Sequence, residues 1–220
     1  MTSSIRNIRH VVTSACVAGL LSGCQMFPDD TDLGQIRKIV TIAFSPPPKV
    51  TLAQAAAIPY ASIGVQIDGG AQGILILATD NGGEQLWTSS SRIAIITRQG
   101  RITKTAGLPY NLGASYSPSG EEAQRQPGLA RLVDFPNLGL YGVSVFCEEQ
   151  KIGVETITLL NTPIQAMRSE EHCHSDKVKL SWRFTNRFWR DPKSGFVWRS
   201  EQNIHPMLGT ITLETLRPQE

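Results

Sequence analysis

Hydrophobic and polar residues alternate along much of the chain after residue 50, which is typical of β-strands with one buried face. In residues 178–185, Val, Leu, Trp and Phe occupy every second position, and Lys, Ser, Arg and Thr occupy the positions between them. Residues 63–67 alternate with smaller or polar residues in the same way, and residues 74–78 form a continuous apolar run. These segments predict strands with at least one face buried in the core.

Short turn sequences separate the predicted strands. Gln99 and Gly100 lie between two strand-like segments, residues 92–97 and 101–105, and predict a tight hairpin. Further strands are expected at residues 141–148, 152–160, 196–202 and 210–216. Residues 111–136 are less regular and are interpreted as a connector with one short helix. Because the strands follow one another through short turns, the pattern predicts a mainly β fold built as an antiparallel meander.

Two different patterns precede this region. Residues 11–21 form a short apolar segment behind the basic residues Arg6 and Arg9, as in a secretory signal peptide. Apolar residues then recur at helical spacing over residues 33–44, which predicts an amphipathic helix that ends before three prolines. Its apolar stripe could contact a membrane, although packing on the domain core is the commoner use. The predicted division is a signal peptide over residues 1–23, a lipidated tether with a helix over residues 24–48, and one β-domain over residues 49–220.

The signal peptide ends in Leu21-Ser22-Gly23-Cys24, the pattern of a bacterial lipobox. It predicts cleavage between Gly23 and Cys24 and attachment of a diacylglycerol to the Cys24 sulfur. The alternative is an ordinary cleaved signal, but no Ala-x-Ala site lies nearby. The apolar segment is too short to span a bilayer, which takes about 20 residues. Gln25, rather than Asp, follows Cys24, and this favours the outer membrane, with the domain facing the periplasm.

Charge gives no indication of a polyanionic partner. Loss of Arg6 and Arg9 with the signal lowers the 21 Lys and Arg residues to 19, equal to the 19 Asp and Glu residues. Nucleic-acid binding and electrostatic attraction to an anionic membrane are therefore not expected. No second apolar run approaches membrane-spanning length, so the predicted anchor is lipid alone.

Two cysteines remain after Cys16 leaves with the signal and Cys24 is acylated. In an oxidising compartment Cys147 and Cys173 are expected to form a disulfide, the alternative being two buried free thiols. Residues 170–174, Glu-Glu-His-Cys-His, could hold a metal, but they lack the spaced ligand pairs of a zinc site. A solvated loop carrying the disulfide is the favoured interpretation, with no metal and no cofactor.

Candidate chemistry points to binding rather than catalysis. The sequence lacks the nucleophile elbow, the zinc-protease motif, phosphate loops and the dinucleotide fingerprint. Adjacent carboxylates on a strand face opposite sides, so they do not form a glycosidase pair. Aromatic rings could instead stack on sugars, with an arginine to meet acidic groups. The candidate ligand or partner surface comprises Tyr60, Trp87, Arg101, Trp189 and Trp198. The alternatives are that the rings pack in the core and that the arginine pairs with a carboxylate.

An ordered set of short motifs is similar to the YjbF/GfcB family of lipoproteins. The motifs are Ile58-Pro59-Tyr60-Ala61-Ser62, Trp87, Gln99-Gly100-Arg101-Ile102, Lys104-Thr105-Ala106-Gly107-Leu108, Asn186-Arg187-Phe188-Trp189, Gly195-Phe196-Val197-Trp198-Arg199-Ser200, Gln202, Pro206 and Pro218. The resemblance runs from the lipobox essentially to the C-terminus. It implies a place in group 4 capsule or exopolysaccharide operons, at the outer membrane. It also implies a strongly curved antiparallel sheet like that of LolA and LolB, either a half-open barrel or a two-sheet sandwich.

Three hypotheses follow from these observations. The leading one is a non-enzymatic accessory lipoprotein of capsule or exopolysaccharide secretion that binds a glycan or an export protein. The second is a periplasmic carrier for a lipid or lipidated ligand, which requires a deep apolar cavity beneath the sheet. The third is an assembly factor without a small ligand.

Overall fold

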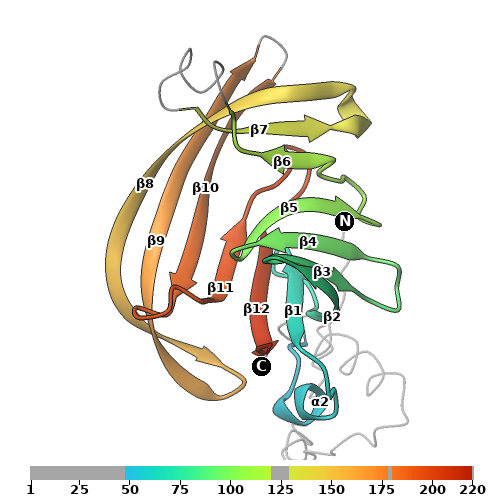
Figure 1. Ribbon diagram of the computed structural model, residues 1–220, viewed down its shortest axis with the longest axis vertical. Helices are drawn as coiled ribbons and strands as arrows, with labels where there is room; N and C mark the ends of the chain where they lie inside the picture. The colour runs from blue at the N-terminus through green and yellow to red at the C-terminus, as the bar shows by residue number, and fades with distance from the viewer. Residues whose placement is uncertain (1–47, 120–128, 178–179, 220) are drawn as a thin grey trace, which may run out of the picture. The chain divides into compact units, whose positions relative to one another are not determined.

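The described part of the chain is built mainly from β-strands. The computed structural model describes residues 48–119, 129–177 and 180–219 (Figure 1). The signal peptide, Cys24 and the helix predicted over residues 33–44 lie outside the described residues. The strands are β1 (Ser62–Ile67), β2 (Gly73–Asn81), β3 (Glu84–Thr88), β4 (Ala94–Arg98), β5 (Arg101–Ala106), β6 (Ala114–Tyr116), β7 (Leu129–Phe135), β8 (Leu140–Leu159), β9 (Thr162–Lys177), β10 (Leu180–Arg190), β11 (Val197–Gln202) and β12 (Ile211–Arg217).

The twelve strands of the described residues all belong to one antiparallel sheet. Their order is β5-β4-β3-β2-β1-β12-β11-β10-β9-β8-β7-β6, so neighbours in the sheet are also neighbours in the chain, except where β1 pairs with β12. The two end strands, β5 and β6, lie close to each other. The sheet is thus nearly closed into a barrel, and β8, β9 and β10 bend strongly along their length (Figure 1). This confirms the predicted curved antiparallel sheet, as one sheet and not a two-sheet sandwich.

The core lies on the face of the sheet that points into this barrel. Its members alternate along the strands, for example Ile63 and Val65 on β1 and Val143 and Val145 on β8. Burying one such side chain stabilises the fold by about 1.5–3 kcal/mol. The other large buried members include Leu75, Trp87, Ile95, Ile102, Phe135, Trp182, Ile211 and Leu213.

Two consecutive residues with left-handed backbone conformation form the tight turn between β4 and β5. Gln99 and Gly100 have φ of 51° and 75°, as a two-residue hairpin with the right-handed strand twist requires. A Cβ atom at Gly100 would lie 2.6 Å from the Cβ of Val197, at the start of β11. Only glycine fits there, and the β4–β5 turn therefore rests directly against β11. The hairpin predicted from the sequence is confirmed.

A short helix interrupts the β-pattern expected from residue 50 onward. Helix α2 (Leu52–Ala56) begins at Thr51, whose side-chain oxygen accepts a hydrogen bond from the Gln54 amide at 3.3 Å. Gln54 Oε1 accepts one from the Thr51 amide at 2.9 Å, which completes a capping box. Among the described residues, no helix is long and apolar enough to cross a bilayer.

The structure corrects three expectations. Residues 111–136 are not simply a connector, since their described part contains β6 and β7, and a 3₁₀ turn (Pro136–Leu138) follows β7. The short helix predicted within this stretch is not tested over residues 120–128, which lie outside the described residues. The strands predicted at residues 141–148 and 152–160 are one strand, β8, with a bulge between Lys151 and Gly153. Residues 170–174 are not a solvated loop but part of β9, which pairs with β8 on one side and β10 on the other. Every second side chain of this segment is therefore buried in the interior.

Candidate functional site

A groove of about 690 Å³ lies between the β4–β5 turn, the β10–β11 turn and the end of β12. This volume is within the range of about 300–1,000 Å³ that is usual for ligand sites. The β10–β11 turn is held in shape by Asp191, whose carboxylate accepts hydrogen bonds from the amides of Lys193 at 3.0 Å and Ser194 at 2.7 Å. The groove therefore has walls of regular strands and well-defined turns.

The charged side chains that line the groove are all arginines: Arg98, Arg101, Arg190 and Arg217. No acidic residue of the described chain is among the lining residues. Arg98 pairs with Glu84 at 3.1 Å, and Arg190 reaches Glu149 at 3.8 Å. Within the described part of the chain, Arg217 has no carboxylate within ion-pair distance. The groove thus presents guanidinium groups, while the partner carboxylates lie outside its lining.

Aromatic rings form part of the same wall. Phe196 is 38% exposed and meets Trp198 edge to face, with ring centroids 4.8 Å apart. Trp87 is buried, and its indole N–H donates to Thr97 Oγ1 at 2.9 Å. Trp87 therefore acts as a floor residue of the groove, while Phe196 offers an accessible ring.

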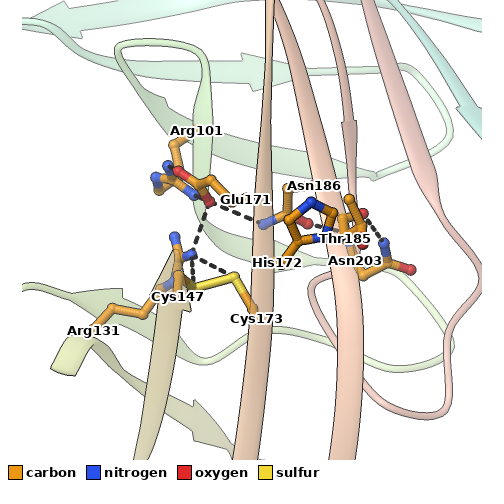
Figure 2. The surroundings of a disulfide bond; sticks show 9 residues. All are labelled: Arg101, Arg131, Cys147, Glu171, His172, Cys173, Thr185, Asn186 and Asn203. Carbon is orange, nitrogen blue, oxygen red and sulfur yellow. Dashed lines mark hydrogen bonds and ion pairs between the residues drawn. A yellow bond between two sulfur atoms is a disulfide. The ribbon is translucent and has the colours of Figure 1, made fainter. Parts of the chain in front are cut away.

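Arg101 is held in place by a buried carboxylate on β9. Glu171 accepts hydrogen bonds from the two terminal guanidinium nitrogens of Arg101, with 2.9 Å between Arg101 Nη1 and Glu171 Oε2 (Figure 2). The same carboxylate accepts from Arg131 Nη2 at 2.9 Å and from Asn186 Nδ2 at 3.4 Å. Two arginines thus share one buried carboxylate, and Arg101 joins this cluster to the groove.

The ionisation of Glu171 is strongly stabilised. Burial opposes the charged form, but the hydrogen bonds and charge of Arg101, followed by those of Arg131, outweigh it and lower the pKa of Glu171 to about 2. Burial and the nearby charge of Arg101 lower the pKa of Arg131, and burial lowers that of Arg190. Desolvation of these cations is thus only partly offset by nearby carboxylates, Glu171 for Arg131 and chiefly Glu149 for Arg190.

Cys147 and Cys173 form a disulfide across β8 and β9, the pairing predicted from the number of cysteines (Figure 2). Arg131 Nη2 lies 2.7 Å from Cys147 Sγ and 3.3 Å from Cys173 Sγ. The two sulfurs and Glu171 lie close enough together to resemble a metal site. The sulfurs are joined to each other, and a guanidinium contacts all three groups, so this donor set does not suit a cation.

Three of the five residues predicted for the ligand surface gather in the groove, namely Trp87, Arg101 and Trp198. Tyr60 is 62% exposed but lies before β1 and does not line the groove. Trp189 is buried in a second cluster with Ile157, Leu159 and Ala166, and its indole N–H donates to Glu155. Packing explains Trp189, as the alternative interpretation proposed.

Sequence reasoning missed Arg98, Arg190, Arg217 and Glu171. The alternation of residues 180–185 continues through Phe188 to Arg190, which places this arginine on the same face as Trp182. Likewise, Glu171 lies two positions before the buried Cys173 and shares its face. Extending the period of two beyond residue 185 would have identified Arg190 as inward-facing. For Glu171 the same reasoning needs the knowledge that residues 170–174 form a strand.

Two solved structures are similar to this chain, and the first is similar enough to compare the fold. The crystal structure of the hypothetical lipoprotein YmcC from Escherichia coli K12 superposes with a TM-score of 0.62 at 19% identity, covering 86% of this chain and 97% of that one. A putative exported protein with a YmcC-like fold, from Bacteroides fragilis NCTC 9343, gives a TM-score of 0.35 at 11% identity, covering 73% and 94%. The first of these shows that the two chains share a fold.

The family follows from the sequence. The model of the group 4 capsule polysaccharide lipoproteins (GfcB, YjbF) matches residues 27–216. The chain therefore belongs to the YjbF family, which confirms the resemblance drawn from the ordered motifs. The search of curated proteins gives no match.

Proposed function

We propose that this protein is a lipid-anchored accessory factor of capsule or exopolysaccharide production, placed on the periplasmic side of the outer membrane. The membership of residues 27–216 in a capsule polysaccharide lipoprotein family is the observation that carries this proposal. The lipobox supports it, since cleavage before Cys24 would leave an acylated N-terminus, a tether and helix over residues 24–48, and the β-domain over residues 49–220.

The proposed role is binding, of a glycan or of an export protein, and not catalysis. Hydrolysis of a glycosidic bond ordinarily uses two carboxyl groups on either side of the bond. The lining of the groove, among the described residues, offers arginines, amides, hydroxyls and aromatic rings. This is the chemistry of recognition, with donors for acidic and hydroxyl groups.

The structure disfavours the alternative of a lipid carrier. An acyl chain needs a deep apolar cavity, but the interior of the sheet is filled by Trp182, Phe135, Ile102 and their neighbours. The cavity beside Arg101, Arg131 and Trp182 measures only about 20 Å³. The groove of about 690 Å³ carries guanidinium groups, which are costly to cover with hydrocarbon.

Deletion of the gene in its native host tests the proposed function. We expect the amount of polysaccharide at the cell surface to fall, and to return when the wild-type gene is supplied in trans. Surface polysaccharide that is unchanged in amount and location would contradict the proposal.

A further inference from the structure

We propose that the groove between the β4–β5 turn, the β10–β11 turn and the end of β12 binds carboxylate-bearing sugars of an acidic polysaccharide. This inference rests on the proposed function for the class of polymer, and it adds the chemical type of the sugar and the residues that recognise it. It depends on the charge of the lining, its hydrogen-bonding groups and its exposed aromatic ring.

The charge of the groove suits an acidic ligand. The arginines converge on the groove from four elements, with Arg98 on β4, Arg101 on β5, Arg190 on β10 and Arg217 on β12. Planar guanidinium groups bind carboxylates through paired hydrogen bonds, so a group of them suits a polymer with repeated carboxylates. A neutral sugar would bring no carboxylate to these guanidinium groups.

The arginines of the groove have few ion-pair partners among the described residues, which favours binding of an added anion. The described chain gives Arg217 no ion-pair partner, and Arg98 has only an exposed partner, Glu84. Among the described residues, Arg101 has one carboxylate partner, Glu171, and shares it with Arg131. Burial lowers the pKa of Arg190, so a bound anion would relieve the cost of holding that cation away from water.

Groups for the remainder of a sugar lie beside the arginines. The lining includes the side chains of Gln85, Gln99 and Ser194, which can hydrogen-bond to hydroxyl groups. Phe196 supplies an exposed apolar ring against which a sugar face can pack. A few placed polar groups on a partly apolar wall are the usual composition of a small-molecule site.

The test uses the full-length protein in detergent micelles, with oligogalacturonate as the acidic probe. The fully methyl-esterified oligomer has the same backbone without the charges and serves as the neutral probe. We expect titration calorimetry to show binding of the acid and at least tenfold weaker binding of the ester. Loss of one hydrogen bond to a charged group lowers affinity by about tenfold. Arg217→Gln and Arg98→Gln should therefore each weaken binding of the acid by about tenfold.

Lys104→Gln is the matched control, since Lys104 is an exposed cation on β5 that does not line the groove. It should leave affinity unchanged, and all three variants should keep the wild-type unfolding temperature. An equal loss of affinity in Lys104→Gln would overturn the proposal, because it would show binding by net charge alone.

Other outcomes separate this inference from the proposed function. Equal affinity for acid and ester would overturn the acidic specificity but leave glycan binding intact. If neither probe binds while gene deletion still lowers surface polysaccharide, the inference is wrong and the function stands. Arg217-dependent binding of phosphatidylglycerol vesicles, without binding of oligogalacturonate, would replace the sugar with a lipid headgroup.

Discussion

Glu171 shows how this sheet tolerates a charge in its interior. A buried carboxylate without partners would be strongly destabilising, but Glu171 receives hydrogen bonds from Arg101, Arg131 and Asn186. Removing this one residue would leave two guanidinium groups without their shared counter-charge. The cluster therefore orders Arg101, which in turn faces the groove.

Glu171→Gln is expected to lower the free energy of unfolding at pH 7 by about 3 kcal/mol, the usual result of breaking a buried ion pair. The pKa of Glu171 is depressed in the folded state, from 4.5 to about 2, so its contribution is complete above pH 4.5 and is lost as the pH falls towards 2. Urea unfolding at pH 7 and at pH 3 measures both effects. Glu148→Gln, at an exposed position on β8, is the control; equal stability of the two variants at pH 7 would contradict this account.

At the scale of elements, the position of the β4–β5 hairpin against β11 decides the shape of the groove. Gly100 contacts the side chain of Val197 so closely that no Cβ atom fits. Gly69 has a similar φ of 71° but has nothing within 4 Å of a Cβ atom. Substitution of Gly69 therefore measures the cost of the left-handed backbone alone, and substitution of Gly100 measures that cost together with the steric clash against Val197.

Gly69→Ala is expected to cost about 1 kcal/mol, from the left-handed conformation alone. Gly100→Ala should cost about 1–3 kcal/mol more, because the added methyl group pushes the hairpin away from β11. Chemical denaturation of both variants measures the difference. If the two substitutions prove equally destabilising, the hairpin does not rest on β11 as described.

The disulfide is expected to stabilise the β8–β9 pair. It closes a loop with a sequence separation of 26, for which the chain-entropy model gives about 3–4 kcal/mol. The double variant Cys147→Ala, Cys173→Ala should therefore unfold at a lower denaturant concentration than the wild type. Reduction should have the same effect on the wild type and none on the double variant. A wild-type protein insensitive to reductant under unfolding conditions would contradict this prediction.

The sequence predicts elements where alternation is clean and turns are explicit. The β4–β5 hairpin, β1 and β10 follow from period-two patterns and from turn residues such as Gln99 and Gly100. The course of residues 170–174 was not predictable from composition, because Glu and His are typical of solvated loops. Only pairing with Arg101 and Arg131, distant in sequence, makes a buried Glu171 stable. Likewise, the four arginines of the groove come from four strands, and no local pattern encodes the meeting of these strands.

At the scale of the whole molecule, the proposed function depends on the predicted lipid anchor as well as on the β-domain. Cys24→Ala is expected to abolish incorporation of an alkyne-labelled fatty acid and to release the protein from the outer-membrane fraction, since the acyl chains alone supply the predicted attachment. Cys16→Ala, within the signal peptide, is the matched control and should be labelled as the wild type is. Fatty-acid labelling that persists in Cys24→Ala would contradict the lipobox interpretation.

Complementation of the deletion strain tests the central claim most directly, because it joins the groove to the polysaccharide in the cell. Strains would carry the wild-type gene, the Arg98→Gln, Arg217→Gln double variant, or Lys104→Gln, each at equal protein level, and surface polysaccharide would be measured. The account predicts restoration by the wild type and by Lys104→Gln, and a marked deficit with the double variant. Full restoration by the double variant would contradict it.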